Sequence, residues 1–218
     1  MIIRDPFTDQ ELAAIRAATE EAEKQTGGEL VCVIVQRCDT YEASAWKATS
    51  LGAVGGALAA GLWQVFGDVW IWNPLPWILL PPVLGAAFGL LTVWIAPPLR
   101  RLLIPPAVLQ RRVDRRAATA FLNEEIFDTR ERTGVLLFVA LFEHQIRILR
   151  DQGIDKLVPE EEWAPIIANL TRSLRVSDKG EAIIEAIQAC GQLLATHGVA
   201  RRPDDLNELG DAPRLYDE

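Results

Sequence analysis

Charged residues are almost absent from a long central part of the sequence. Between Lys47 and Arg100 the only charged residue is Asp68, which leaves uncharged runs of 20 and 31 residues in a chain of 218. A bilayer core needs about 20 apolar residues per helix, so each run is long enough for one membrane span. Neither run contains an ionisable side chain, and a proton relay, ion pathway or transporter site therefore has no residue to carry it. The two runs are predicted to be an anchor.

Cysteine is also scarce, and the signatures of several enzyme classes are missing. Cys32, Cys38 and Cys190 lack the spacing of metal ligands. The sequence contains no Cys-x5-Arg loop, no Asp-x-Asp motif, no histidine-rich cluster and no nucleotide-binding glycine signature. The first 40 residues have no basic segment leading into an apolar one, so we expect no signal peptide. Acidic residues outnumber basic ones by 30 to 22, which argues against nucleic acid as a partner.

The membrane spans are predicted at residues 46–66 and 77–95, with residues 68–76 as the loop between them. Basic residues mark the side of a span that stays in the cytoplasm. Lys47 precedes the first span and the loop has no basic residue, whereas six arginines follow the second span: Arg100, Arg101, Arg111, Arg112, Arg115 and Arg116. We therefore predict a protein of the inner (plasma) membrane with two spans and both termini in the cytoplasm.

Small residues recur four positions apart in each span, Gly52 with Gly56 and Gly85 with Gly89. Such spacing lets two helix backbones approach closely in lipid. The glycines either pack the two spans of one hairpin together, which is the simpler explanation, or form a homo-oligomer through the spans. Pro81-Pro82 predicts a kink or a late start in the second span.

The remaining sequence alternates between helical and strand patterns. A helix is predicted from Thr8, where Glu11 completes a capping-box signature, to Gly27-Gly28. Continuous apolar runs at residues 29–36 and 135–142 predict buried strands, and residues 145–150 predict a strand nearer an edge. Further helices are predicted at residues 107–132, 160–174 and 177–196. This order indicates an α/β (α+β) domain in which a small sheet is covered by helices.

The domain is predicted to be discontinuous, made of residues 1–45 and 105–199 and interrupted by a transmembrane helical hairpin at residues 46–104. This arrangement requires residues 29–36 to pair beside residues 135–142. The last segment, residues 200–218, is rich in acids and has little apolar surface to bury. It is predicted to be a disordered tail.

Residues 8–36 and 106–197 resemble the TPM domain family, which includes photosystem II repair-associated thylakoid proteins and bacterial membrane-tethered proteins. The resemblance rests on a helix ending in Thr26-Gly27 before a valine-rich strand, and on the strand Gly134–Leu137. It continues with the pair Arg147-Ile148, then Gly153 and the step Val158-Pro159. Where many members have Gly-Tyr-Gly-Leu, this chain has Asp-Gln-Gly-Ile, so one glycine of that run remains.

The resemblance implies the domain fold and a choice of functions. Some members are described as acid phosphatases or calcium binders, and others as assembly or repair factors. With no catalytic motif in the sequence, our leading hypothesis is a membrane-anchored cytoplasmic domain that acts as an interaction, assembly or repair factor with a membrane protein partner. The alternative is a metal-dependent acid-phosphatase-like hydrolase using Ca²⁺ or Mg²⁺.

Polar residues gather around the strand pair at 135–150 and are the best candidates for a site. Glu143, Asp151 and Asp155 could supply oxygen ligands to Ca²⁺ or Mg²⁺, and His144 or Arg147 could bind an anion. Polar residues at a hairpin tip are also the ordinary solvated outcome. The arginines at 100, 101, 111, 112, 115 and 116 are expected to meet anionic lipid headgroups, because each basic residue near such a leaflet contributes about 1 kcal/mol.

Overall fold

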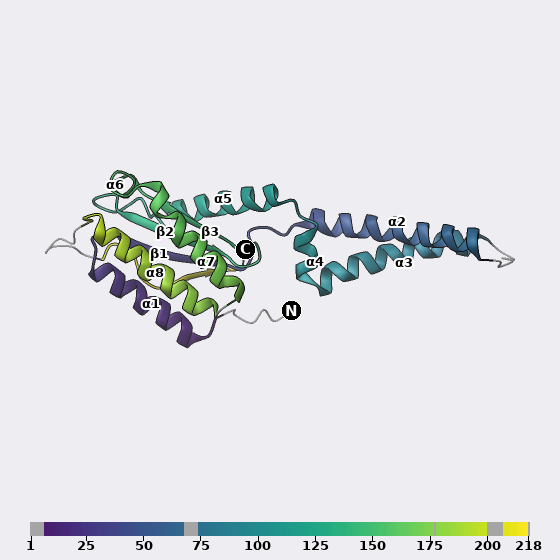
Figure 1. The fold of residues 1–218 in the computed structure, drawn as a ribbon, viewed down its shortest axis with the longest axis horizontal. Coiled ribbons are helices and arrows are strands. Elements are labelled where there is room, and N and C mark those ends of the chain that lie inside the picture. The colour runs from purple at the N-terminus through teal and green to yellow at the C-terminus, as the bar shows by residue number, and fades with distance from the viewer. Residues whose placement is uncertain (1–6, 68–73, 177, 200–206, 218) are drawn as a thin grey trace. The chain divides into compact units, whose positions relative to one another are not determined.

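The chain folds into two compact units (Figure 1). The computed structural model describes residues 7–67, 74–176, 178–199 and 207–217. The sheet unit comprises Met1–Asp39 and Gln110–Glu218, and the hairpin unit comprises Thr40–Leu109. The hairpin unit is therefore inserted within the sequence of the sheet unit.

The sheet unit is built on a pair of buried parallel strands. β1 (Glu29–Val35) pairs with β2 (Gly134–Ala140) along its whole length, and every residue of both strands is buried. β3 (Gln145–Arg150) returns antiparallel beside β2, and β4 (Arg214–Tyr216) lies parallel to β1, giving the order β3-β2-β1-β4. The predicted pairing of residues 29–36 beside residues 135–142 is confirmed.

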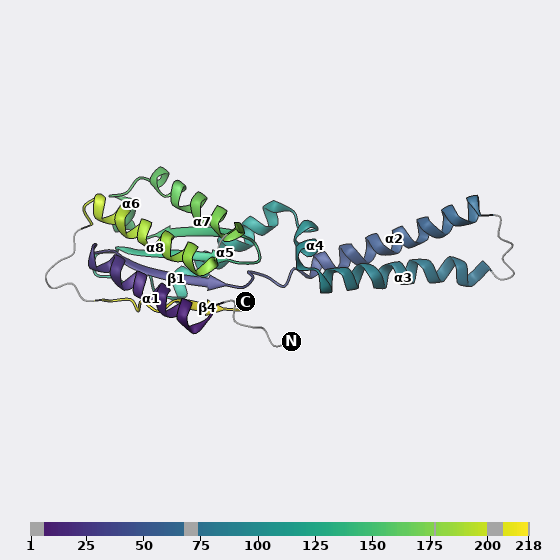
Figure 2. The ribbon, with the colours of Figure 1, turned by 60° about the horizontal axis from the view of Figure 1, so that its bottom comes forward.

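Helices cover both faces of this sheet (Figures 1 and 2). α1 (Asp9–Lys24), α7 (Ala164–Val176) and α8 (Lys179–Thr196) pack on one face, and α5 (Pro106–Asn123) packs on the other. Side chains alternate along a strand, so Cys32 and Ile34 of β1 enter the first core and Val31 and Val33 enter the second. The expectation of a mixed α and β fold, with a small sheet covered by helices, is confirmed.

Local signals explain where several elements begin and end. Thr8 and Glu11 form the predicted capping box at the start of α1. The helix predicted at 107–132 ends earlier, at Asn123, and Glu125 follows with a left-handed backbone (φ 54°) that breaks the helical path. The connection from β3 to α7 contains α6 (Gln152–Asp155) and a 3-10 turn, η1 (Glu160–Glu162), where a continuous helix from residue 160 was expected.

The prediction of a disordered tail is wrong for residues 207–217. Leu209 is buried and its N–H donates to Glu29 Oε2 at 3.3 Å, and Arg214–Tyr216 form β4. The acidic segment lies beside Glu23, whose pKa is raised to about 8 by burial and by the neighbouring carboxylates of Glu29 and Asp211. A carboxyl group that holds its proton lowers the repulsion between these acids, which composition alone does not reveal. Residues 200–206 and 218 lie outside the described residues.

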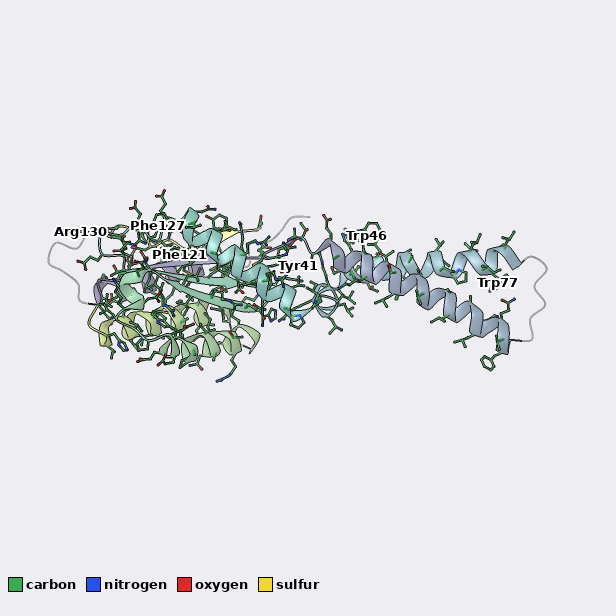
Figure 3. The ribbon with its side chains drawn as sticks, turned by 90° about the horizontal axis from the view of Figure 1, so that it is seen from above. Tyr41, Trp46, Trp77, Phe121, Phe127 and Arg130 are labelled. Atoms are coloured by element: carbon green, nitrogen blue, oxygen red, sulfur yellow. The ribbon has the colours of Figure 1, made fainter. Side chains whose placement is uncertain are left out.

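The described part of the hairpin unit contains α2 (Glu42–Phe66), α3 (Pro74–Ile95), the short α4 (Pro97–Leu102) and the first turn of α5. α2 and α3 are long and apolar enough to cross a membrane. Pro81 and Pro82 lie inside α3, so of the two expected alternatives, a kink or a late helix start, the late start does not occur. Trp46 and Trp77 lie at opposite ends of the α2–α3 pair (Figure 3), both more than half exposed, as tryptophans at the two interfaces of a bilayer are.

Glycines form the contact between α2 and α3. A Cβ added at Gly52 would overlap the Gly85 carbonyl, and a Cβ at Gly85 would overlap the Gly52 carbonyl. Gly56 approaches the Pro81 carbonyl and Gly89 approaches the Ala48 carbonyl in the same way. The glycines therefore pack the two helices of one hairpin together, the simpler of the two explanations.

The pairing of β1 with β2 predicts how fragments of the chain will behave. Residues 106–197 alone should not unfold cooperatively, because β2 would lose β1 and expose backbone groups and aliphatic surface. Replacing residues 40–109 with a flexible linker should leave a soluble, cooperative fold, since loop closure costs only about (3/2)RT ln n. Thermal unfolding followed by circular dichroism checks both; a cooperative fragment beside an aggregated linker protein would contradict the pairing.

The glycine contacts predict the effect of one methyl group. Gly52→Ala should destabilise the hairpin by about 1–3 kcal/mol, because the closely packed backbones must separate. Gly55→Ala is the matched control: its Cβ would meet nothing within 4 Å, and alanine is the better helix former by about 1 kcal/mol. Helix loss on titration with sodium dodecyl sulfate measures both. Dissociation of a dimer by Gly52→Ala with unchanged hairpin stability would favour the oligomer explanation instead.

Candidate functional site

The candidate site lies where β1 and β2 end. In open α/β sheets, ligands bind outside the carboxyl ends of the parallel strands. β1 ends at Val35 and β2 at Ala140, and the two chains continue side by side: the N–H of Leu141 donates to the Val35 carbonyl at 3.0 Å, and that of Phe142 donates to the Gln36 carbonyl at 2.9 Å. The turn to β3 and the segment leading to the hairpin unit therefore meet at one edge.

Glu143 is the central residue of this edge. Its side chain is fully buried, and Oε1 accepts the backbone N–H of Cys38 at 2.8 Å. His144, the next residue, has a left-handed backbone (φ 50°) that turns the chain into β3. The predicted pair Glu143-His144 thus forms the tight turn, and its carboxylate holds the segment that follows β1.

The surroundings of the Cys38 thiol disfavour its thiolate form. Burial raises its pKa, and the carboxylate of Glu143 raises it further, against weaker opposing effects from Arg116 and Arg147. Reactive cysteines need a lowered pKa because the thiolate is the nucleophile. The backbone N–H of Cys38 nevertheless contacts this edge, donating to Glu143 Oε1.

Ion pairs surround this edge and connect it to α5. Arg147 Nε lies 2.5 Å from Asp114 Oδ1, and Arg112 Nε lies 2.7 Å from Asp39 Oδ2. Arg147 was expected to bind an anion and Arg112 a lipid headgroup, and in the structure a carboxylate of the sheet unit faces each guanidinium. The Arg112–Asp39 pair fixes the last residue before the hairpin unit against α5, just after the chain returns from that unit.

Asp151 and Asp155 lie at the other end of β3. Asp151 is buried; its Oδ1 accepts the N–H of Gln152 at 2.7 Å, and its Oδ2 lies 2.7 Å from Arg132 Nε. Asp155 Oδ1 lies 2.7 Å from Arg150 Nε. These two carboxylates begin and support the short helix α6, for which Asp151 is the N-cap.

The structure does not bring the three expected metal ligands together. Glu143 precedes β3 and Asp151 follows it, and a strand rises about 3.3 Å per residue, so the six residues of β3 separate them by roughly 20 Å. Across the residues that the structure describes, no group of three or more His, Cys, Asp or Glu side chains could hold a metal ion. The set of Glu143, Asp151 and Asp155 does not fit a shared Ca²⁺ or Mg²⁺, because each carboxylate organises a different segment of backbone.

The six arginines expected at lipid headgroups also fall into separate groups. In the hairpin unit, Arg100 Nε donates to the Ser44 hydroxyl at 3.2 Å and Arg101 is partly exposed. Arg116 lies over the ring of Tyr216, 5.7 Å from its centroid. Arg111 and Arg115 are exposed on α5.

Sequence reasoning missed Glu124 altogether. This residue follows α5, and its carboxylate contacts both Arg214 and Tyr216 of β4. Nothing in the pattern marks it, because its partners lie in a segment whose composition predicted disorder.

The fold and this edge define a three-layer α/β/α domain with a helical hairpin inserted after its first strand. The sequence model of the family described as TPM domain matches residues 104–193. Residues 104–193 therefore match this family, and the resemblance is confirmed over that part of the chain.

A solved structure has a similar fold. It is described as the NMR structure of the BA42 protein from the psychrophilic bacterium Bizionia argentinensis, with a TM-score of 0.59 and 17% sequence identity over 98% of this chain and 97% of that one. A likeness at this identity concerns the fold alone. A search of curated proteins found no match.

The burial of Glu143 predicts a structural effect on substitution. Glu143→Ala should lower the free energy of unfolding by about 1–3 kcal/mol, because the partly buried Cys38 N–H loses its acceptor. Glu161→Ala, at an exposed position, is the control and should change it by less than about 0.5 kcal/mol. Urea denaturation of the full chain in detergent measures both, and equal stability of the two variants would contradict this role.

Proposed function

We propose that the chain is an integral membrane protein whose TPM domain acts as an interaction, assembly or repair factor on the cytoplasmic face of the inner (plasma) membrane. The proposal of a membrane anchor rests on the apolar outer surface of the hairpin. Large side chains of α2 and α3 are about half exposed or more: Leu51, Val54, Leu58, Leu62, Val65, Phe66, Ile78, Leu79, Val83, Leu84, Phe88 and Leu91. A core helix of a soluble protein hides such side chains, whereas lipid accommodates them.

The arginine distribution supports the cytoplasmic placement of the TPM domain. Arg101 follows α3, and Arg111 and Arg115 are exposed at the start of the sheet unit's return segment. Basic residues flanking a span remain in the cytoplasm and attract anionic headgroups. These three arginines are the best placed of the six for headgroup contact, because Arg100, Arg112 and Arg116 contact Ser44, Asp39 and Tyr216.

Two features of the domain support the role as an interaction factor: its filled interior and its connections to the hairpin unit. Both faces of the sheet are sealed by helices, and the two chain connections to the hairpin unit leave from one place, held by Glu143 and by the Arg112–Asp39 pair. Because the interior of such a domain is filled by its own side chains, a partner would bind to its outer surface. The partner class that suits this attachment is another protein of the same membrane.

Cysteine labelling tests the topology. In a background without the native cysteines, Asn73→Cys should react with an impermeant maleimide in intact cells, and Thr196→Cys should react only after permeabilisation. Asn73 lies between α2 and α3, and Thr196 is exposed at the end of α8. Labelling of Thr196→Cys in intact cells would place the TPM domain outside and contradict the proposal.

Photocrosslinking in native membranes tests the role. A photoreactive residue at exposed Ala118 on α5, compared with one at exposed Leu75 in the hairpin, should give a discrete adduct with a membrane protein from the domain position. The same protein, purified, should not hydrolyse a generic phosphate ester with Mg²⁺ or Ca²⁺. Turnover without any specific adduct would favour the phosphatase alternative.

A further inference from the structure

The edge of β1 that faces away from β2 is occupied by the short strand β4. Val33, Ile34 and Val35 of β1 lie opposite Arg214, Leu215 and Tyr216, and the N–H of Gln36 donates to the Tyr216 carbonyl at 2.9 Å. β4 has only three residues, so few backbone hydrogen bonds hold it. Exposed strand edges accept extended peptides from other chains, and here the chain's own short strand covers such an edge.

The carboxylate of Glu124 contacts two side chains of β4. Arg214 and Tyr216 are two residues apart and share a face of the strand. Arg214 Nε donates to Glu124 Oε2 at 2.8 Å, and the Tyr216 hydroxyl donates to Glu124 Oε1. The side chains of Arg214 and Glu124 are only 23% and 14% exposed, so this ion pair is stronger than a solvated one.

All three residues of β4 make side-chain contacts with the sheet unit. Leu215 points to the opposite face and packs against the core beneath α1 and α8. Arg116 stacks over the Tyr216 ring. The hydrogen bond to Glu124 raises the pKa of Tyr216 above its ordinary value. The edge thus contacts a guanidinium, an apolar side chain and a phenol in three consecutive positions.

We propose that this edge of β1 is a peptide-binding site for an extended segment of the pattern Arg–apolar–Tyr, with Glu124 as the residue that determines specificity. The chain's own segment 214–216 occupies the site in cis. A partner protein with this pattern adds in its place as a parallel strand, using the same backbone hydrogen bond and the same carboxylate. This inference goes beyond the proposed function and does not depend on the membrane topology.

Binding of a fluorescent peptide of residues 207–218 to the full chain in detergent tests the site. Arg214→Ala with Tyr216→Phe removes both contacts of the cis segment to Glu124, so this variant should bind the peptide at least tenfold more tightly than the wild type does. Adding Glu124→Gln to that variant should abolish the gain. A peptide that itself carries Arg214→Ala and Tyr216→Phe is the matched control and should bind to none of the three proteins.

Equal binding of the peptide by all three proteins, or no binding by a folded double variant, would overturn the proposal. Hydrogen exchange on the wild-type chain provides a measurement that needs no variant. Excess wild-type peptide should speed exchange of the amides of residues 214–216 several-fold, because the cis segment is displaced, while the control peptide leaves them unchanged. Unchanged protection at saturating wild-type peptide would equally overturn it.

Discussion

The parallel pairing of β1 with β2 is the constraint on which the rest of the structure depends. A parallel pair cannot be closed by a tight turn and requires a long crossover, and here the crossover contains the whole hairpin unit followed by α5. Because the cost of closing a loop grows only logarithmically with its length, so large an insertion is tolerated. The pair places seven buried residues from each strand between two cores, and it brings the exit and the return of the hairpin to the same part of the sheet unit.

Carboxylates hold the segments that leave this strand pair. Glu143 accepts the N–H of Cys38, Asp39 pairs with Arg112, and Asp151 begins α6 while pairing with Arg132. Glu124 does the same for β4. Each of these groups satisfies backbone or guanidinium donors that would be costly to bury alone. This explains why acids that look like metal ligands in sequence lie apart in space.

The hairpin unit is packed differently from the sheet unit; if it spans a bilayer as proposed, lipid provides no hydrophobic force to bring its two helices together. Close backbone contact at Gly52, Gly56, Gly85 and Gly89 supplies the packing, and the large apolar side chains are left on the outside. Arg100 and Lys47 bind the Ser44 hydroxyl and the Leu103 carbonyl at the base of the hairpin. These contacts all lie within one hairpin.

The sequence predicted the order of elements, the apolar hairpin and the TPM resemblance, because each depends on residues close together in the chain. These are the capping box at Thr8, the apolar runs of β1 and β2, and the uncharged runs beside Asp68. The sequence by itself also indicated that Glu143 and His144 form a turn. Only the tertiary structure decided which polar residues meet. Asp151 and Asp155 are close to Glu143 in sequence yet lie beyond the far end of β3, since an extended strand carries its ends apart, whereas Glu124 meets Arg214 and Tyr216 across ninety residues. The strand β4 escaped detection for the same reason: three residues in an acidic segment acquire their structure from the edge of β1 and the carboxylate of Glu124, and neither is visible in the local sequence.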